Sequence, residues 1–152
     1  MRGSNGEELP GAILFACTMN SVRSVMAAAI MKHLFGKFVY VDSAGVRVGE
    51  LDPLAVEVMD EIGIEIGKYK PKDFDQLEDS SFDLCVTLSP EAQHRAIDLA
   101  HTSAIEIEYW ATMDPTIFEG SRDQRLENYR QVRDGLMKRI EERFSGTRAA
   151  DT

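Results

Sequence analysis

Residues 12–24 read AILFACTMNSVRS, and this stretch decides the fold. Its first five residues are apolar, which is typical of a short strand buried on both faces. Small and polar residues follow from Cys17, and from Arg23 apolar residues recur at helical spacing until Gly36. We therefore predict a strand, a loop and a helix in direct succession. In open parallel sheets, ligands bind at junctions of this kind.

The rest of the chain continues this alternation of strand and helix. Strands are predicted at residues 38–41, 82–88 and 104–108, helices at residues 53–62, 90–100 and 122–144, and a turn at residues 43–45. The strand at 104–108 is the most polar and is expected at a sheet edge. The pattern predicts an α/β, single-domain, three-layer fold, in which a four-stranded parallel sheet carries helices on both faces.

The long helix predicted at residues 122–144 has one apolar face. That face comprises residues at helical spacing, namely Leu126, Tyr129, Val132, Leu136 and Ile140. Arg130 and Arg133 fall off it, and both are expected to lie in solvent.

Length and composition set limits on the class of protein. The 152 residues are 43% hydrophobic and 28% charged, as in one globular domain. We expect a folded domain at residues 11–146, with a flexible leader at 1–10 and a flexible tail at 147–152. Two cysteines are too few for a disulfide framework, and a cytoplasmic location is expected.

The charge and hydropathy of the chain exclude two classes of partner. Lys and Arg total 17 against 26 Asp and Glu, which gives a formal charge of -9. Such a surface repels phosphate backbones, so no nucleic-acid partner is expected. No apolar run approaches the roughly 20 residues of a membrane span, so no membrane partner is expected either.

Residues 17–24 form the candidate site. A helix N-terminus presents free N–H groups to anions, and a cysteine placed there favours the thiolate. Arg23 supplies a planar fork for two oxygens of a tetrahedral anion. Ser24 can donate a hydrogen bond to the sulfur, and Asn20 and Ser43 can support the loop. The alternative is that Cys17 is a small buried hydrophobe and Arg23 a surface charge.

The motif from Cys17 to Ser24, with Met26-Ala27 after it, resembles the signature of low-molecular-weight protein tyrosine phosphatases. The related thioredoxin-coupled arsenate reductases share it. Further matches to the pattern of these proteins are the segments at 42–45, 52–59, 114–115 and 129–134, so the likeness spans most of the chain.

The resemblance implies a phosphomonoesterase that works through a phosphocysteine and acts on a phosphotyrosine protein or a small aryl phosphate. Cys17 would be the nucleophile and Asp114 the general acid. The phosphate-binding loop would comprise Thr18, Met19, Asn20, Ser21, Val22 and Arg23. No cofactor or metal is implied, and His33, His94 and His101 form no ligand-spaced cluster with cysteine.

Several alternatives remain open at this point. Asp114 before Pro115 is also a common turn cap. Two other functions are compatible with the same residues. One is arsenate reduction with an external thiol, and the other is oxyanion binding without catalysis. Tyr109, Trp110 and Phe118 are candidates for either a substrate rim or the core. Arg47 either attracts an acidic peptide or is simply solvated.

The sequence also departs from the pattern of those proteins. Met19 stands where the loop usually has Gly, and we expect a conformational cost there. Ser89 stands where the reductases have an extra cysteine, and Val22 where some phosphatases have one. Cys85 is expected to be a buried structural thiol, so a thiol relay within the chain is disfavoured.

Overall fold

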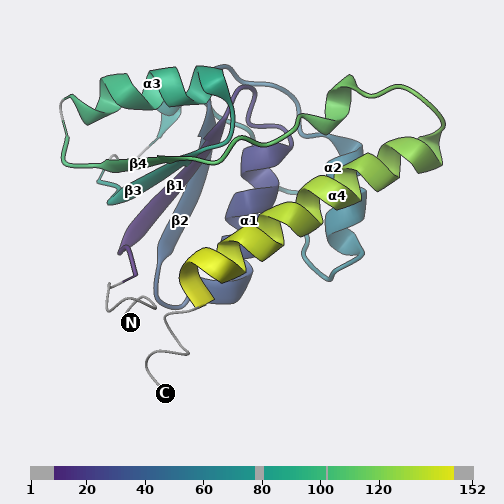
Figure 1. Cartoon of the computed structure of the whole chain (residues 1–152), viewed down its shortest axis with the longest axis horizontal. Helices are drawn as coiled ribbons and strands as arrows, with labels where there is room; N and C mark the ends of the chain where they lie inside the picture. Colours follow the sequence, from purple (N-terminus) through teal and green to yellow (C-terminus); the bar gives the residue numbers. More distant parts are fainter. Residues whose placement is uncertain (1–8, 78–80, 102, 146–152) are drawn as a thin grey trace.

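A computed structural model describes residues 9–77, 81–101 and 103–145 (Figure 1). The leader predicted at 1–10 falls mostly outside these residues, and the tail predicted at 147–152 lies wholly outside them. No helix in the described part of the chain is long and apolar enough to cross a membrane.

Four parallel strands form the sheet, as predicted. They are β1 (Ala12–Cys17), β2 (Tyr40–Gly45), β3 (Leu84–Thr87) and β4 (Glu106–Tyr109), in the order β2-β1-β3-β4. β4 lies at an edge, as its polar sequence indicated. Because β1 pairs with β2 on one side and β3 on the other, the strand order reverses at β1, which ends at Cys17.

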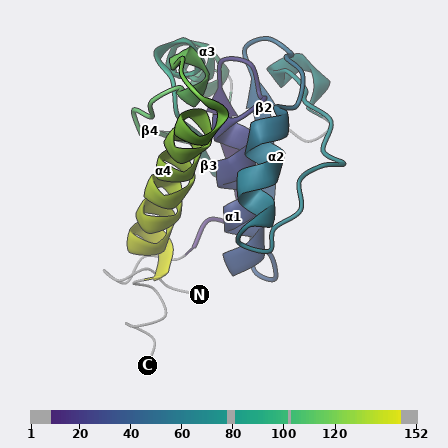
Figure 2. The same cartoon turned by 90° about the vertical axis from the view of Figure 1, so that its right-hand side faces the viewer.

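Helices cover both faces of the sheet, which confirms the three-layer prediction (Figures 1 and 2). α1 (Arg23–Phe35), α2 (Pro53–Asp60) and α4 (Arg122–Ile140) share one core cluster with Ile13 and Phe15 of β1. α3 (Pro90–Ala100) shares the other with Leu14 and Ala16. The side chains of β1 alternate between the two clusters, so this strand is buried on both faces.

β2 differs from its prediction, because it begins at Tyr40 and continues through the residues predicted as a turn. Pairing with β1 keeps Ser43–Gly45 extended, and Gly45 lies opposite Cys17. A Cβ on Gly45 would lie 2.7 Å from the Asn20 nitrogen and 2.8 Å from the Met19 carbonyl carbon. This glycine is therefore required for close approach to the loop rather than for a turn.

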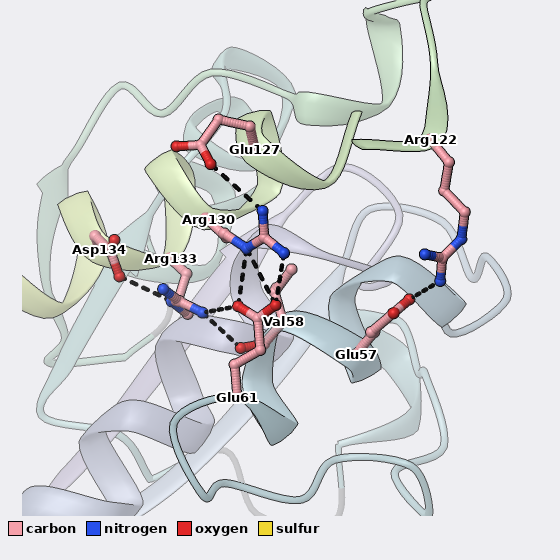
Figure 3. Close-up of polar contacts among 8 residues, drawn as sticks. All are labelled: Glu57, Val58, Glu61, Arg122, Glu127, Arg130, Arg133 and Asp134. Atoms are coloured by element: carbon pink, nitrogen blue, oxygen red, sulfur yellow. Dashed lines mark hydrogen bonds and ion pairs between the residues drawn. The ribbon is translucent and has the colours of Figure 1, made fainter. Parts of the chain in front are cut away.

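The expectation for Arg133 is wrong, because this side chain is buried between α4 and α2 (Figure 3). Its Nη1 donates to the Val58 carbonyl at 2.7 Å and to Glu61 at 2.8 Å, and its Nε donates to Asp134 at 2.8 Å. Arg130 is half-buried and also binds Glu61, at 2.8 Å from its Nη2. Both arginines reach Glu61, the residue that follows α2, and Arg133 also reaches Val58 on α2; helical spacing within α4 cannot reveal these acceptors.

Glu61, Arg130 and Arg133 are called here the α2–α4 ionic network. The hydrogen bonds from Arg130 are the main reason that the pKa of Glu61 is lowered from 4.5 to about 2. Partial burial raises this pKa, and Arg133 lowers it further. A separate ion pair, between Arg122 and Glu57, joins the same two helices (Figure 3). The predicted helix at 122–144 ends as α4 at Ile140 and continues as a π-helical turn, Glu141–Ser145.

Candidate active site

The loop between β1 and α1 is held in shape from outside by the segment that follows β2. Backbone N–H groups of Val46, Arg47 and Gly49 donate to the carbonyls of residues 17, 18 and 19 at 2.8–3.1 Å. The N–H of Asp52 reaches the carbonyl of Ser21 at 3.3 Å. These four loop carbonyls therefore point away from the centre of the loop.

The N–H groups of the same loop have no such partners. Within residues 9–77, 81–101 and 103–145, no oxygen accepts a hydrogen bond from the backbone N–H groups of residues 18–24. Val22 is the N-cap residue of α1, and it provides no side-chain cap. This row of free donors, together with the helix dipole, suits a bound oxyanion.

A hollow of about 50 Å³ lies at this loop, and its lining residues are Cys17, Met19, Ser21, Val22, Arg23, Asp114 and Thr116. Pockets for organic cofactors measure roughly 300–1,000 Å³, so this space suits a much smaller group. The structure thus brings together the three residues assigned to chemistry, which come from β1, α1 and the segment after β4.

Arg23 turns toward this hollow rather than into solvent. Its side chain is 11% exposed, and its Nη1 donates to the Thr112 carbonyl at 3.1 Å. Its Nη2 lies 3.9 Å from Asp114 Oδ2. The guanidinium is therefore anchored beside Cys17 with a carboxylate on its other side, and the interpretation of Arg23 as a surface charge is excluded.

Asp114 uses its two oxygens differently. Oδ1 accepts hydrogen bonds from the Thr116 N–H at 3.0 Å and the Thr116 hydroxyl at 2.7 Å, and so caps a short 3₁₀ helix, Pro115–Ile117. Oδ2 faces Arg23. The turn-cap role is real, and it fixes the carboxylate while leaving one oxygen directed at the site.

Behind the loop lies a set of neutral polar side chains, called here the Asn20 network: Asn20, Ser24 and Ser43, which are buried, and Tyr69, which is half-buried. Ser24 Oγ lies 2.9 Å from Cys17 Sγ and accepts from Asn20 Nδ2 at 2.7 Å. The Tyr69 hydroxyl lies 2.8 Å from Asn20 Oδ1 and 2.6 Å from Ser43 Oγ. Tyr69 was missed by the sequence analysis, since it stands in a polar stretch with no pattern to mark it.

The expected cost at Met19 is not found. Among the non-glycine residues that the structure describes, only Asn20 has a positive φ, of 53°. Asparagine tolerates this left-handed region better than most side chains, so the loop turns without a glycine at position 19. Met19 is instead 38% exposed at the rim of the hollow.

The second cysteine is separated from the first by the sheet. Cys85 is fully buried in β3 and belongs to the core cluster on the α3 side, whereas Cys17 belongs to the cluster on the α1 side. Burial raises the pKa of the Cys85 thiol to about 12. Its assignment as a buried structural thiol is confirmed.

The aromatic residues considered for a substrate rim, Tyr109, Trp110 and Phe118, are not among those that line the hollow. Trp110 is buried and packs edge-on against Phe15 with ring centroids 6.1 Å apart, so it belongs to the core. Tyr109 is exposed and Phe118 half-buried. Arg47 is exposed and pairs with Glu91 at 2.9 Å.

In the described residues, no group of three or more His, Cys, Asp or Glu side chains is arranged to hold a metal.

Ser89 has a structural role where the related reductases would carry a cysteine. It is the N-cap of α3, and its hydroxyl accepts from the Ala92 N–H at 3.2 Å. Thr18 of the loop donates to the same oxygen at 3.0 Å. This position therefore lies beside the loop, although it carries no sulfur.

With this geometry, comparison with known proteins identifies the family. The model of the low molecular weight phosphotyrosine protein phosphatases matches residues 12–148, and the chain belongs to this family. The arsenate reductase of Halalkalibacterium halodurans is 38% identical over 128 residues, covering 84% of this chain and 91% of that protein. The arsenate reductase of Bacillus subtilis is 33% identical over 131 residues, covering 86% and 92%.

Solved structures of both phosphatases and reductases share the fold. The low molecular weight protein tyrosine phosphatase from T. tengcongensis superposes with a TM-score of 0.71 at 25% identity, covering 86% of this chain and 95% of that one. The arginine phosphatase from Geobacillus stearothermophilus gives a TM-score of 0.69 at 26% identity, covering 88% and 90%. The relatives are thus named as phosphatases or as arsenate reductases.

Proposed function

We propose that this chain is a cysteine-dependent phosphomonoesterase of the tyrosine phosphatase type. The observation that carries the proposal is the position of Cys17 in a small hollow lined by Arg23 and Asp114 and surrounded by free loop N–H groups. Each of these groups has a use in phosphoryl transfer, whereas binding alone would need no carboxylate beside the anion.

In the first half of the reaction, the Cys17 thiolate attacks phosphorus and the bond to the leaving oxygen breaks. Arg23 and the loop N–H groups hold the three equatorial oxygens and offset the charge on them. Asp114 Oδ2 gives its proton to the leaving oxygen, so the alcohol or phenol departs neutral. Sγ is then bonded to phosphorus.

In the second half, the Asp114 carboxylate takes a proton from a water molecule. The water oxygen attacks phosphorus, the sulfur–phosphorus bond breaks, and phosphate leaves with the thiolate restored. The cap made by Thr116 keeps the carboxylate in place for both proton transfers.

Hydrolysis of p-nitrophenyl phosphate without added metal is the direct test. Cys17→Ala should abolish turnover, while Cys85→Ala, the matched control, should keep it. Asp114→Ala should slow poor leaving groups far more than good ones, with Asp123→Ala, an exposed carboxylate on α4, as control. Equal losses for all leaving groups would contradict the acid role. Phosphate binding without hydrolysis would favour the non-catalytic module instead.

The substrate class is assigned from the rim of the hollow. Met19 lines the hollow and is exposed, and Met113 and Ile117 are exposed apolar neighbours in sequence of Asp114 and Thr116, which line it. An aryl ring can pack on such a rim, so we assign phosphotyrosine or a small aryl phosphate. A panel of phosphotyrosine, phosphoserine and phosphoarginine tests this; a preference for phosphoarginine would assign the chain to the activity of its arginine phosphatase neighbour.

Arsenate reduction is the second candidate, favoured by the names of the relatives. The Cys17 thiolate would displace hydroxide from arsenate, and an external thiol would attack the sulfur of the adduct and release arsenite with a mixed disulfide. Cys85 cannot supply that thiol, because it is buried on the other face of the sheet. Arsenite production with glutathione present would support this candidate; none with any reductant would remove it.

A further inference from the structure

We propose that the outer edge of β2 is a docking site for an acidic, extended segment of a partner protein. The site is a groove of about 1160 Å³ that is lined by residues 32–34 and 36–42 together with Lys72 and Gln76. None of these residues lines the hollow at Cys17. The groove is called here the β2-edge groove, and its proposed role lies beyond the proposed hydrolysis.

The β2-edge groove lies at the far end of β2 from the hollow. β2 is an edge strand of the sheet (Figure 1), and it begins at Tyr40 in the groove and ends at Gly45, opposite Cys17. With a rise of about 3.3 Å per residue, the two ends of this strand are roughly 16 Å apart. A segment bound in the groove therefore leaves the hollow open to substrate.

The charge of the groove is opposite to that of the whole chain. Three lysines line the groove against one carboxylate, that of Asp42, whereas the chain has 26 acidic and 17 basic residues. Asp42 is already paired with Lys72 at 2.6 Å. In the described part of the chain, Lys32 and Lys37 form no ion pair. These two charges can therefore pair with carboxylates of a partner.

The helix dipole accounts for only part of this cluster of cations. Lys32 and His33 lie in the last turn of α1, where positive charge offsets the dipole. Lys37 lies after the end of that helix, and Lys72 comes from the segment before the 3₁₀ helix Phe74–Gln76. Two separate segments of the chain therefore bring cations to the same groove.

Two exposed aromatic rings supply the apolar part of the groove. Phe38 is 58% exposed and Tyr40 is 51% exposed. Tyr40 stacks on Phe82 with ring centroids 6.1 Å apart and an interplanar angle of 24°, which fixes its orientation. A ring that is fixed and half exposed can bind an apolar side chain at a low cost in conformational entropy. We therefore expect apolar side chains among the acidic residues of the partner segment.

The backbone of β2 favours a partner in extended conformation. The Tyr40 N–H donates to the Gly11 carbonyl at 2.9 Å, so the alternation of a parallel strand directs the N–H and carbonyl of Val41 to the outer edge. Farther along this edge, the Gly45 N–H already donates to the Lys72 carbonyl at 2.9 Å. A strand added beside Val41 would extend that pairing, as in peptide recognition by β-augmentation.

Fluorescence anisotropy with a fluorescein-labelled peptide, eight glutamates around two central phenylalanines, tests the charge of the groove. The double variant Lys32→Gln/Lys37→Gln should bind this peptide about threefold to tenfold more weakly, on the scale of two exposed ion pairs. Lys68→Gln/Lys138→Gln is the matched control; it removes the same charge from exposed positions outside the groove and should bind as wild type does. Equal losses in both double variants would show non-specific attraction and overturn the proposal.

A second pair of measurements tests the aromatic part of the groove. Phe38→Ala should weaken binding of the same peptide by about fivefold or more, on the scale of a buried aromatic anchor. Tyr109→Ala, at an exposed ring on the opposite edge of the sheet, should change nothing. Binding that is as strong with glutamine in place of every glutamate would overturn the assignment of an acidic partner.

Hydrogen exchange and amide NMR shifts locate the bound peptide. The Val41 N–H should exchange more slowly in the complex, whereas the Asp42 N–H, which faces β1, should keep its rate. Amide shifts should concentrate at residues 36–42 and 72–76. Shifts confined to residues 17–24 would place the peptide in the hollow and overturn the proposal. Shifts in the groove that appear without peptide as the protein is concentrated would assign the groove to a second copy of the chain instead.

These measurements require no turnover, so they are independent of the proposed function. A protein that hydrolyses no phosphate ester, but binds the acidic peptide in the β2-edge groove, would refute the esterase and uphold the docking site. An active esterase that fails to bind the peptide would uphold the esterase and refute the docking site.

Discussion

The Asn20 network and the α2–α4 ionic network solve different problems with different chemistry. In the first, the side chains are neutral, and Asn20, Ser24 and Ser43 are fully buried. In the second, the groups are charged, and the side chains of Glu61 and Arg130 are about one-third exposed, at 34% and 33%. The first ends on the Cys17 sulfur, while the second contributes no residue to the hollow.

The contrast follows from what each place tolerates. Extra charged groups around Cys17 would compete with the guanidinium of Arg23 for an anionic substrate. Neutral hydrogen bonds fix the geometry of the loop without changing the electrostatic potential at the site. Between α2 and α4, Glu61 and Arg130 remain partly hydrated, Arg133 is buried with each of its contacts a hydrogen bond, and the charges serve to join two helices. We therefore expect the first network to control activity and the second to control stability.

The largest expected effect is on activity, in Arg23→Lys. A lysine offers a point charge in place of a planar fork, so kcat/KM for p-nitrophenyl phosphate should fall by about 10³, on the scale of a lost oxyanion donor. The midpoint of urea unfolding should hardly move. Arg47→Lys, in an exposed ion pair, is the control and should retain activity. Near-normal turnover in Arg23→Lys would contradict the role of the guanidinium in holding the oxyanion.

Arg133→Met should lower stability and leave activity almost unchanged. The change leaves the Val58 carbonyl without its arginine donor and removes one of the two cations on Glu61, so the free energy of unfolding should fall by about 1–3 kcal/mol. Turnover should stay within about twofold, as at other sites remote from the chemistry. Lys138→Met, on the exposed side of the same helix, is the matched control. A large loss of activity with unchanged stability would contradict the division of roles.

The α2–α4 ionic network should also make the free energy of unfolding depend on pH. The folded-state pKa of Glu61, about 2, lies below its ordinary 4.5. The carboxylate therefore stabilises the fold fully above about pH 4.5, and this contribution is lost as the pH falls toward about 2. The difference in urea stability between wild type and Glu61→Gln should shrink over that range. A difference that stays constant from pH 6 to pH 2 would refute the assignment.

The smallest expected effect is that of Cys85→Ala. Removal of one buried sulfur should lower the free energy of unfolding by about 1 kcal/mol and leave both turnover and Cys17 alkylation unchanged. Labelling of intact protein should give a single modified cysteine, because Cys85 is buried and its pKa is raised to about 12. Loss of activity here would reopen a relay between the two thiols.

What the sequence could predict was local. The strand–loop–helix order at residues 12–24 is encoded by neighbours in the chain, and so is the helix predicted at residues 90–100. Tyr69 and Arg133 act across 49 and 75 residues, on partners that only the packing brings near. No periodicity within their own segments reveals those partners.

The difference between local sequence and contacts made by distant residues also explains the two expectations that failed, at Met19 and in β2. A conformational cost was expected at Met19, but the left-handed conformation falls on Asn20, whose side chain accepts a hydrogen bond from Tyr69. Residues 43–45 were predicted as a turn from their small side chains. Their size serves instead the close approach between Gly45 and the loop, which depends on the pairing of β1 with β2.

The central claim is that Cys17 carries the phosphoryl group. Asp114→Ala should slow hydrolysis of the intermediate, so a rapid denaturing quench during turnover of p-nitrophenyl phosphate should trap it. Peptide mass spectrometry should then find phosphate on the peptide that contains Cys17, and none in the Cys17→Ala variant. Turnover with no phosphorylated Cys17, or with phosphate on another residue, would contradict the account.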